Sequence, residues 1–500
     1  MGRLQRLGVA LLWGVNLALR LWHLGSPSTL VFDEVHYVPF AVDYLQHQAF
    51  FDVHPPLGKD LIALGIRVFQ LFQSLDPTSD PTAGGAVQVA GMALSPVSFR
   101  WLNALLGSLM PVTALWVAWT WAKDISLPRR RCFAVLAGLL TSWDGFSLVE
   151  SRLGLLHPAL VGLGLLALGA WGRSRDALTP WPWRLLAGIA LGGAIAVKWN
   201  GAGYWLVLVL GEVLTRRPWY RRRLGAADAA PQKVSGRAGL PLALPNQGTN
   251  KPRRWLWLGW LPLGVYGLLW VPHLHLVGVG FWPIHHTILN AHLGLTDTHR
   301  YQSAWFTWPL MIRPIAYFYQ GLGVGETLNL IGPTVPNPDR AVALYGMGNP
   351  ILWWLSTAAV GMGALQVLRG WWPQRRSLAH IAAALRQGQR LSAPTPRAVT
   401  SAAALQRLLI MAYAVNWLPW AIVQRSTFLY HYQPAALIAE LILAWQMSGW
   451  LTSHRRSWQC WGGGLLALIG ASFLFWLPLW MGWPLTVEAM GWRWWLPSWI

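Results

Sequence analysis

Long apolar blocks recur along the whole chain and are separated by shorter polar or charged stretches. Each block approaches the roughly 20 residues that an α-helix needs to cross the hydrocarbon core of a bilayer. Proline and glycine interrupt several blocks, which predicts kinked helices inside a bundle. The pattern predicts about eleven membrane spans, near residues 7–25, 96–122, 132–149, 157–172, 184–199, 201–215, 255–275, 349–368, 404–423, 428–448 and 459–480.

Three polar segments are too long to be simple turns, and long loops are usually functional or disordered. They cover residues 26–95, 276–348 and the tail after 480. Within the first, Ala41–Leu45 and Leu57–Leu75 have the pattern of amphipathic helices that lie in the membrane interface. A fourth polar segment, on the opposite side, is basic and rich in Ala, Gly and Pro. It predicts a linker over 216–254.

Composition supports one all-α, polytopic membrane domain over residues 1–500. Only 11% of the residues are charged, against roughly 25% in soluble domains, and 54% are apolar. The net charge of +21 comes from short basic clusters between apolar blocks, which indicates topology signals and not a nucleic-acid surface. The two cysteines, Cys132 and Cys460, predict neither a disulfide framework nor a cysteine metal site.

The positions of the basic clusters also predict the orientation of the chain. With the N-terminus in the cytoplasm, most Lys and Arg residues lie inside and most carboxylates outside. The first apolar block then acts as a retained signal anchor, since no small-residue cleavage site follows it. We expect a multi-pass plasma-membrane (inner-membrane) protein with its chemistry on the extracytoplasmic face.

An adjacent acidic pair, Asp33 and Glu34, follows the first predicted span. One carboxylate there could act as a general base while the other orients it. The alternative is a hydrated loop pair or an anchoring salt bridge. Farther along the same loop, Lys59 could approach a lipid phosphate, whereas Gly58-Lys59 lacks the rest of an ATP-binding P-loop.

Short motifs at the predicted outer ends of spans carry a family resemblance. In order they are FDEVHYVPFAVDYL (32–45), FFDVHPPLGKDLIALG (50–65), Phe99-Arg100, Glu150-Ser151-Arg152, Val197–Gly201, His299–Ser303, Trp308–Leu310, Gly348–Trp354 and Phe428–Tyr432. Together the motifs, which extend along most of the chain, make it resemble the protein O-mannosyltransferases, glycosyltransferase family 39. It is similar to the compact bacterial type.

The resemblance implies a glycosyltransferase C (GT-C) fold and an inverting reaction. Mannose would pass from a polyprenyl-phosphate-linked donor to Ser or Thr hydroxyls of translocated proteins, with Asp33 as the base and Glu34 as its essential neighbour. It implies no cofactor, because the lipid-linked sugar is a substrate, and no nucleic acid; membrane lipid is a further partner. It also directs attention to candidate substrate-binding residues at the outer ends of the spans: His54, Pro55, Lys59, Arg100, Glu150, Arg152, Lys198, Asn200, His299, Arg313, Arg425 and His431.

Charge development explains the interest in the cations of this set. The leaving phosphate gains negative charge, so a nearby Lys or Arg would stabilise the transition state. Each such cation could instead snorkel or pair with a carboxylate, for which Glu150 is a candidate. The spacing of His54, His299 and His431 matches no compact metal-binding motif, so we predict no metal site.

Two departures from the family and two alternative functions remain. Segment 276–348 is too short for the β-rich MIR domain of fungal and animal members, and His157 stands where the family resemblance predicts Asp. A related transferase could use another lipid-linked sugar or a lipid or glycan acceptor. A transporter is the other alternative, although the ionisable residues gather at one face and not near the midplane.

Overall fold

The computed structural model describes residues 2–75, 85–216, 255–294, 298–322, 340–386 and 401–500, with side chains described up to residue 213 in the second range and residue 369 in the fifth. Much of the predicted linker over 216–254, and part of the predicted loop over 276–348, lie outside these ranges. The helices are α1 (Arg3–Leu21), α2 (Glu34–Leu45), α3 (Leu57–Leu75), α4 (Pro96–Trp121), α5 (Leu127–Ser142), α6 (Gly145–Glu150), α7 (His157–Ser174), α8 (Trp181–Val197), α9 (Ala202–Arg216), α12 (Leu261–Val277), α13 (Phe281–Gly294), α14 (Pro350–Arg386), α15 (Ser401–Trp417), α16 (Gln433–Leu451), α17 (Arg456–Met481) and α18 (Val487–Gly491).

Each of the eleven predicted spans coincides with a helix. Among the described residues, five helical stretches are long and apolar enough to cross a membrane, which establishes a multi-pass membrane protein. They are Pro96–Trp121, Leu256–Val277, Pro350–Arg369, Leu429–Leu451 and Arg456–Met481. A full count of eleven crossings stays a prediction.

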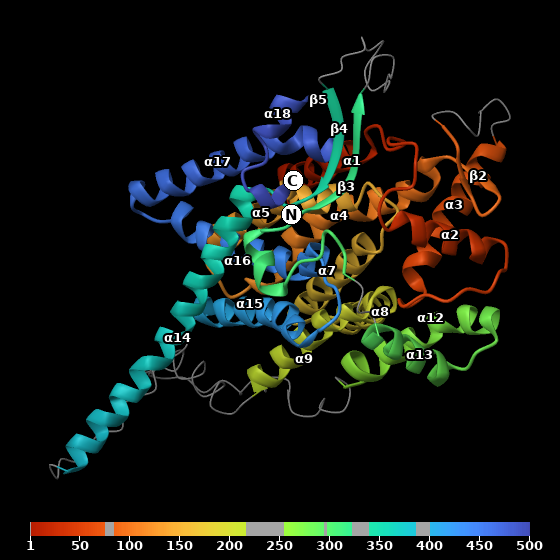
Figure 1. Cartoon of the computed structure of the whole chain (residues 1–500). Coiled ribbons are helices and arrows are strands. Elements are labelled where there is room, and N and C mark those ends of the chain that lie inside the picture. The colour runs from red at the N-terminus through yellow and green to blue at the C-terminus, as the bar shows by residue number, and fades with distance from the viewer. Residues whose placement is uncertain (1, 76–84, 217–254, 295–297, 323–339, 387–400) are drawn as a thin grey trace.

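The bundle packs around α16, which is buried along most of its length. It contacts α5, α14 and α15, while α7 packs between α4 and α8. Figure 1 shows this central packing and the long α14, which extends away from the body. Helices that are apolar on all sides, as α16 is, belong inside a bundle and not at its surface.

The predicted helix over Leu57–Leu75 is α3, and the predicted helix near Ala41–Leu45 is the end of α2. The two helices pack together, and α3 also contacts α4 (Figure 1). Their position in the membrane interface stays a prediction.

The expectation of an all-α chain was wrong in one respect, because two small antiparallel sheets accompany the helices. β1 (Val87–Val89) pairs with β2 (Met92–Leu94), and β3 (Ile315–Leu322) pairs with β4 (Arg340–Gly346), which also pairs with β5 (Leu485–Thr486). The strands lie in segments interpreted as loops because short strands give a weaker periodic signal than long helices. The larger sheet joins the predicted loop over 276–348 to the C-terminal tail.

Candidate active site

The acidic pair lies where the loop after α1 turns into α2. Asp33 precedes the helix and Glu34 is its first residue. Phe32, immediately before them, has a positive φ of 50°, which is uncommon for a residue other than glycine. Such backbone strain is often found at functional sites. The turn brings the two carboxylates into different surroundings.

Glu34 is enclosed by the protein. Arg100, near the start of α4, donates from Nε to Glu34 Oε1 at 2.8 Å and from Nη2 to Oε2 at 2.7 Å. The backbone N–H groups of Val31 and Gly154 also donate to Glu34, at 2.9 and 2.7 Å. Both charged side chains are fully buried. Glu34 therefore fastens the loop to the bundle, as the anchoring alternative predicted.

Asp33, in contrast, is only partly enclosed. Its side-chain partner among the described residues is Tyr37, whose hydroxyl donates at 3.4 Å, a long hydrogen bond. Burial raises the pKa of Asp33 to about 6; the positive charge of Lys198 opposes this rise, and the negative charge of Glu150 adds to it. A carboxylate with spare acceptor capacity and a pKa near the working pH is suited to general base catalysis.

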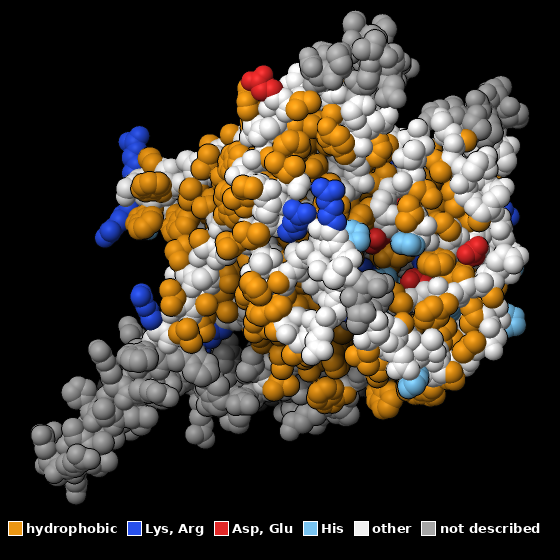
Figure 2. Space-filling model, in the orientation of Figure 1, with side chains coloured by type: hydrophobic (Ala, Val, Ile, Leu, Met, Phe, Trp, Pro, Cys, Tyr) orange, Lys and Arg blue, Asp and Glu red, His pale blue; other side chains and the backbone are white. Residues whose placement is uncertain are grey.

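Aromatic rings surround the turn that carries Asp33. The centroid of the Phe32 ring lies 4.8 Å from that of the Tyr317 ring and 6.3 Å from that of the Tyr430 ring. Phe428 and His299 approach the same ring at 6.4 and 6.3 Å. Figure 2 shows acidic and histidine side chains together on the α2 side of a face that is otherwise largely apolar. Aromatic faces of this kind commonly pack against the apolar faces of ligands.

A second group of buried polar side chains lies beside Asp33. Glu150 Oε2 lies 2.7 Å from His157 Nδ1, and His157 Nε2 lies 3.0 Å from Lys198 Nζ. The Tyr317 hydroxyl donates to the other Glu150 oxygen. Tyr317, from β3, was missing from the predicted site because its segment was interpreted as a loop. The run of three consecutive aromatic residues within Ile315–Leu322, a composition typical of strands, was the available signal.

Three further cations of the predicted set, like Arg100, are held by partners in the protein itself. The Lys59 ammonium pairs with Asp52 and donates to the carbonyl oxygens of His54 and Pro55 at 2.8 and 3.1 Å, so all three of its N–H groups are occupied. Arg152 and Arg313 donate to backbone carbonyl oxygens: those of Leu19 and Trp22 for the first, and those of Arg300, Ser498 and Ile500 for the second. These contacts hold loops and termini together. Lys59 and Arg100, both predicted as phosphate ligands, therefore have their N–H groups engaged by the protein.

Lys198 and Arg425 retain unused donors. His157 accepts one N–H of the buried Lys198 ammonium, which also lies 4.8 Å from the centre of the Tyr430 ring. Arg425 is half-buried and makes no hydrogen bond or ion pair with the described residues. Close to Lys198 in sequence, the Asn200 amide has both polar atoms buried without a partner in the described part of the chain. Unsatisfied buried groups of this kind indicate a missing ligand or water.

The three histidines of the predicted set differ in their surroundings. His54 is half-buried, 5.9 Å from the His292 ring, and burial lowers its pKa well below the usual value. His299 is exposed and lies against Phe428 at 5.1 Å. His431 is buried, and its Nδ1 accepts the Phe428 backbone N–H at 3.0 Å. Across the described ranges, no three His, Cys, Asp or Glu side chains are grouped to hold a metal ion.

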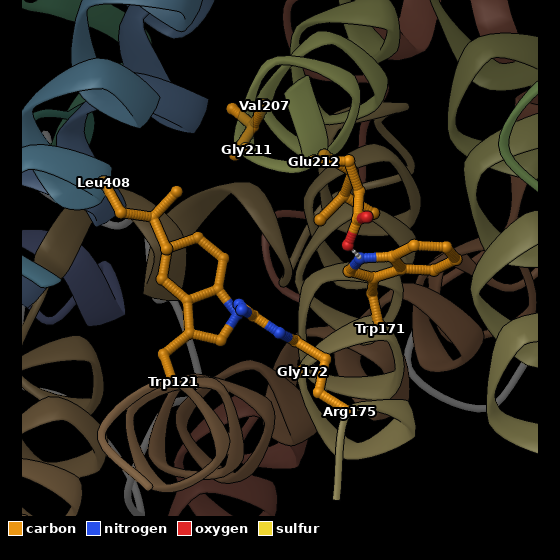
Figure 3. Close-up of a pocket in the computed structure, with 9 residues that line it drawn as sticks. Trp121, Trp171, Gly172, Arg175, Val207, Gly211, Glu212 and Leu408 are labelled. Atoms are coloured by element: carbon orange, nitrogen blue, oxygen red, sulfur yellow. Dashed lines mark hydrogen bonds between the residues drawn. The ribbon is translucent and has the colours of Figure 1, made fainter. Parts of the chain in front are cut away.

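A separate pocket lies at the opposite end of the bundle from Asp33. It is formed at the ends of α4 and α7 that are remote from Arg100 and His157. Figure 3 shows Arg175 extending toward the Trp121 indole, and the Trp171 N–H donating to Glu212 at 3.2 Å. The lining residues are Trp121, Trp171, Gly172, Arg175, Val207, Leu208, Gly211, Glu212 and Leu408. None of these lining residues belongs to the described residues of the acidic site.

The fold and site define a multi-span helical membrane protein with a carboxylate site at one end of its bundle. The chain belongs to the protein O-mannosyltransferase family. The model for dolichyl-phosphate-mannose-protein mannosyltransferase matches residues 10–238, and that for the C-terminal four TMM region of protein-O-mannosyltransferase matches residues 279–499.

Relatives and a solved structure agree with this assignment. The polyprenol-phosphate-mannose--protein mannosyltransferase of Mycobacterium tuberculosis is 24% identical, with 98% of this chain and 90% of that protein covered. The protein of the same name from Corynebacterium glutamicum is 25% identical over 67% of each chain. The S. cerevisiae protein O-mannosyltransferase Pmt1-Pmt2 complex bound to the sugar donor matches with a TM-score of 0.75 at 15% identity, covering 100% of this chain and 93% of that chain. This last likeness concerns the fold.

Proposed function

We propose that this chain transfers mannose from a polyprenyl-phosphate-linked donor to hydroxyl groups of proteins, with Asp33 as general base. The observation that carries the proposal is the contrast within the acidic pair. Both oxygens of Glu34 accept hydrogen bonds from Arg100, while Asp33 receives one long hydrogen bond and lies near the Lys198 ammonium. The family membership and the names of the relatives support the same reaction.

The proposed step is an inverting displacement. The acceptor oxygen of a Ser or Thr attacks C1 of the mannose and gives its proton to Asp33. The bond between C1 and the phosphate oxygen breaks, and polyprenyl phosphate leaves with the electron pair. A β-linked donor then gives an α-linked product. Lys198 and Arg425 carry the charges that would stabilise the departing phosphate, and Asn200 offers an additional hydrogen bond.

We further propose that the site faces the outside of the plasma membrane. The basic residues Arg129–Arg131 and Arg455–Arg456 lie at the end of the bundle opposite Asp33, as the excess of cytoplasmic Lys and Arg requires. In a background with both native cysteines replaced, His299→Cys should react with an impermeant thiol reagent in intact cells. Arg455→Cys should react only after lysis. Equal labelling of both in intact cells would overturn the orientation.

Purified protein in proteoliposomes tests the reaction. It is given polyprenyl-phosphate [¹⁴C]mannose with a Ser/Thr peptide or a matched Ala peptide. Label should enter only the hydroxyl peptide, be released by alkaline β-elimination and be sensitive to an α-mannosidase. Label in a lipid or glycan fraction, or transfer from a different lipid-linked sugar only, would favour the related transferases. We expect transfer to continue in EDTA, because Asp33 and the cations supply the groups that the step requires.

A further inference from the structure

Three ionisable side chains at three helix ends form a buried chain beside Asp33. Glu150 ends α6, His157 begins α7 and Lys198 follows α8. All three residues are at least 97% buried. The transfer chemistry gives a role to Lys198 alone, so the other two require an explanation of their own.

The chemistry of the three side chains determines which atom donates and which accepts in each of these hydrogen bonds. An ionised Glu150 can only accept, so the His157 Nδ1 that lies 2.7 Å away carries the proton and donates it. His157 Nε2 then holds a lone pair and accepts from the Lys198 ammonium at 3.0 Å. A doubly protonated His157 would direct N–H toward N–H, so this geometry requires the neutral ring.

The neutral ring has an electrostatic consequence. The family resemblance predicts Asp at position 157, and that carboxylate would offset the charge of Lys198 while lying beside the carboxylate of Glu150. His157 separates the two charged groups and contributes no charge itself. Lys198 therefore keeps two of its three N–H groups for another acceptor.

We propose that His157 is a positioning residue, which transmits the fixed position of Glu150 to Lys198 and holds that ammonium in place for the donor phosphate. Glu150 is fixed in turn by the Tyr317 hydroxyl, and Lys198 by the Tyr430 ring. The inference rests on the proposed function, which brings a phosphate to this site. In metal sites, the side chains that bind the metal are likewise oriented by hydrogen bonds from groups that do not touch it.

Two substitutions separate the two ends of the His157 ring. His157→Asn keeps an N–H near the position of Nδ1 but is too short to accept from Lys198. His157→Gln carries its amide oxygen to the position of Nε2 and can accept from Lys198. The probe is polyprenyl phosphate, titrated against the purified full chain by thermal shift. We expect His157→Asn to weaken binding about tenfold, His157→Gln to recover most of it, and the exposed control His454→Asn to bind like the wild type.

A double-mutant cycle with Lys198→Gln tests whether His157 acts through Lys198. In that background, His157→Asn should cause no further loss of polyprenyl phosphate binding. The same loss in both backgrounds, or unchanged binding by His157→Asn alone, would overturn the inference while leaving the proposed function intact. A folded wild-type protein that does not bind polyprenyl phosphate would overturn the proposed function itself. If His157→Asn does not fold, the cycle is made with Glu150→Gln, whose effect should also vanish in the Lys198→Gln background.

Discussion

Asp33 and Glu34 are adjacent carboxylates at the start of α2, but the surroundings of their side chains differ. On one side, Glu34 is fully buried and receives two N–H groups from Arg100 and two from the backbone. On the other, Asp33 is partly enclosed and receives one long hydrogen bond from Tyr37. Neighbouring carboxylates thus have opposite surroundings.

This difference separates structure from chemistry within a single dipeptide. A carboxylate whose lone pairs are already used cannot take a proton from a substrate without losing its ion pair. A carboxylate with free acceptor capacity and a raised pKa can. The environment, not the residue type, assigns the roles, as in other enzymes that use paired carboxylates.

The largest effect is expected from Asp33→Asn. Asn keeps the shape but cannot accept the proton, so turnover should fall by about 10² to 10⁴. Mannose transfer to a Ser/Thr peptide at saturating donor measures it. Asp43→Asn, on the same helix, is the matched control and should transfer at the wild-type rate. Near-normal transfer by Asp33→Asn would remove the proposed base.

Glu34→Gln should act mainly on stability. Removing one partner of a buried ion pair typically costs about 3–5 kcal/mol, because Arg100 is left buried and unpaired. We expect a lower melting temperature in detergent, with Glu488→Gln at an exposed site as the neutral control. Transfer per folded molecule should fall less than in Asp33→Asn. An unchanged melting temperature with transfer abolished would instead give Glu34 a direct part in catalysis.

The sequence predicted much of the architecture because long apolar helices leave a strong periodic signal. Every predicted span coincides with a helix, and α3 has the predicted bounds, Leu57–Leu75. The β3–β4–β5 sheet was not predicted, because its strands pair segments far apart in sequence. Tyr317 lies in β3, so it was not predicted as a site residue either.

Within the site, the sequence identified the charged residues but not the partners to which each of them hydrogen-bonds. Arg100 and Lys59 were as plausible phosphate ligands as Lys198. The distinction depends on which carbonyl and carboxylate oxygens lie within reach, such as Asp52 and His54 for Lys59. Those partners are brought together by tertiary packing, which no local motif records.

Arg425→Gln extends the comparison to the phosphate. The half-buried Arg425 has no protein partner among the described residues, so its loss should leave the fold intact. Loss of a charge-assisted hydrogen bond should raise the KM for the polyprenyl-phosphate donor about tenfold. The KM for the acceptor peptide should change much less. Arg455→Gln, at the opposite end of the bundle, serves as the control, and an unchanged donor KM in Arg425→Gln would leave Lys198 as the proposed phosphate ligand.

The smallest effect, a loss of about half, is expected from lowering the pH to about 6, and it addresses the Asp33 side of the comparison directly. Burial raises the pKa of Asp33 to about 6, and the residue is a base only when ionised. Activity should therefore be full well above pH 6, fall to about half near pH 6 and drop about tenfold for each further unit below it. The phosphodiester of the donor stays ionised over this range, so it does not produce the same profile. The measurement is kcat/KM for the acceptor against pH, because this ratio reports the free enzyme.

Histidines near Asp33 provide the competing explanation for such a profile. His36 is exposed, and its positive charge lowers the pKa of Asp33. If Asp33 controls the acid limb, His36→Gln should keep it and move its midpoint slightly upward, because a nearby positive charge is lost. Lys198→Gln should move the midpoint upward as well, since the charge of Lys198 lowers the pKa of Asp33 more strongly than that of His36 does. An acid limb that disappears in His36→Gln would assign the titration to the histidine, and the proposed base would then need a pKa far below the pH range of the assay.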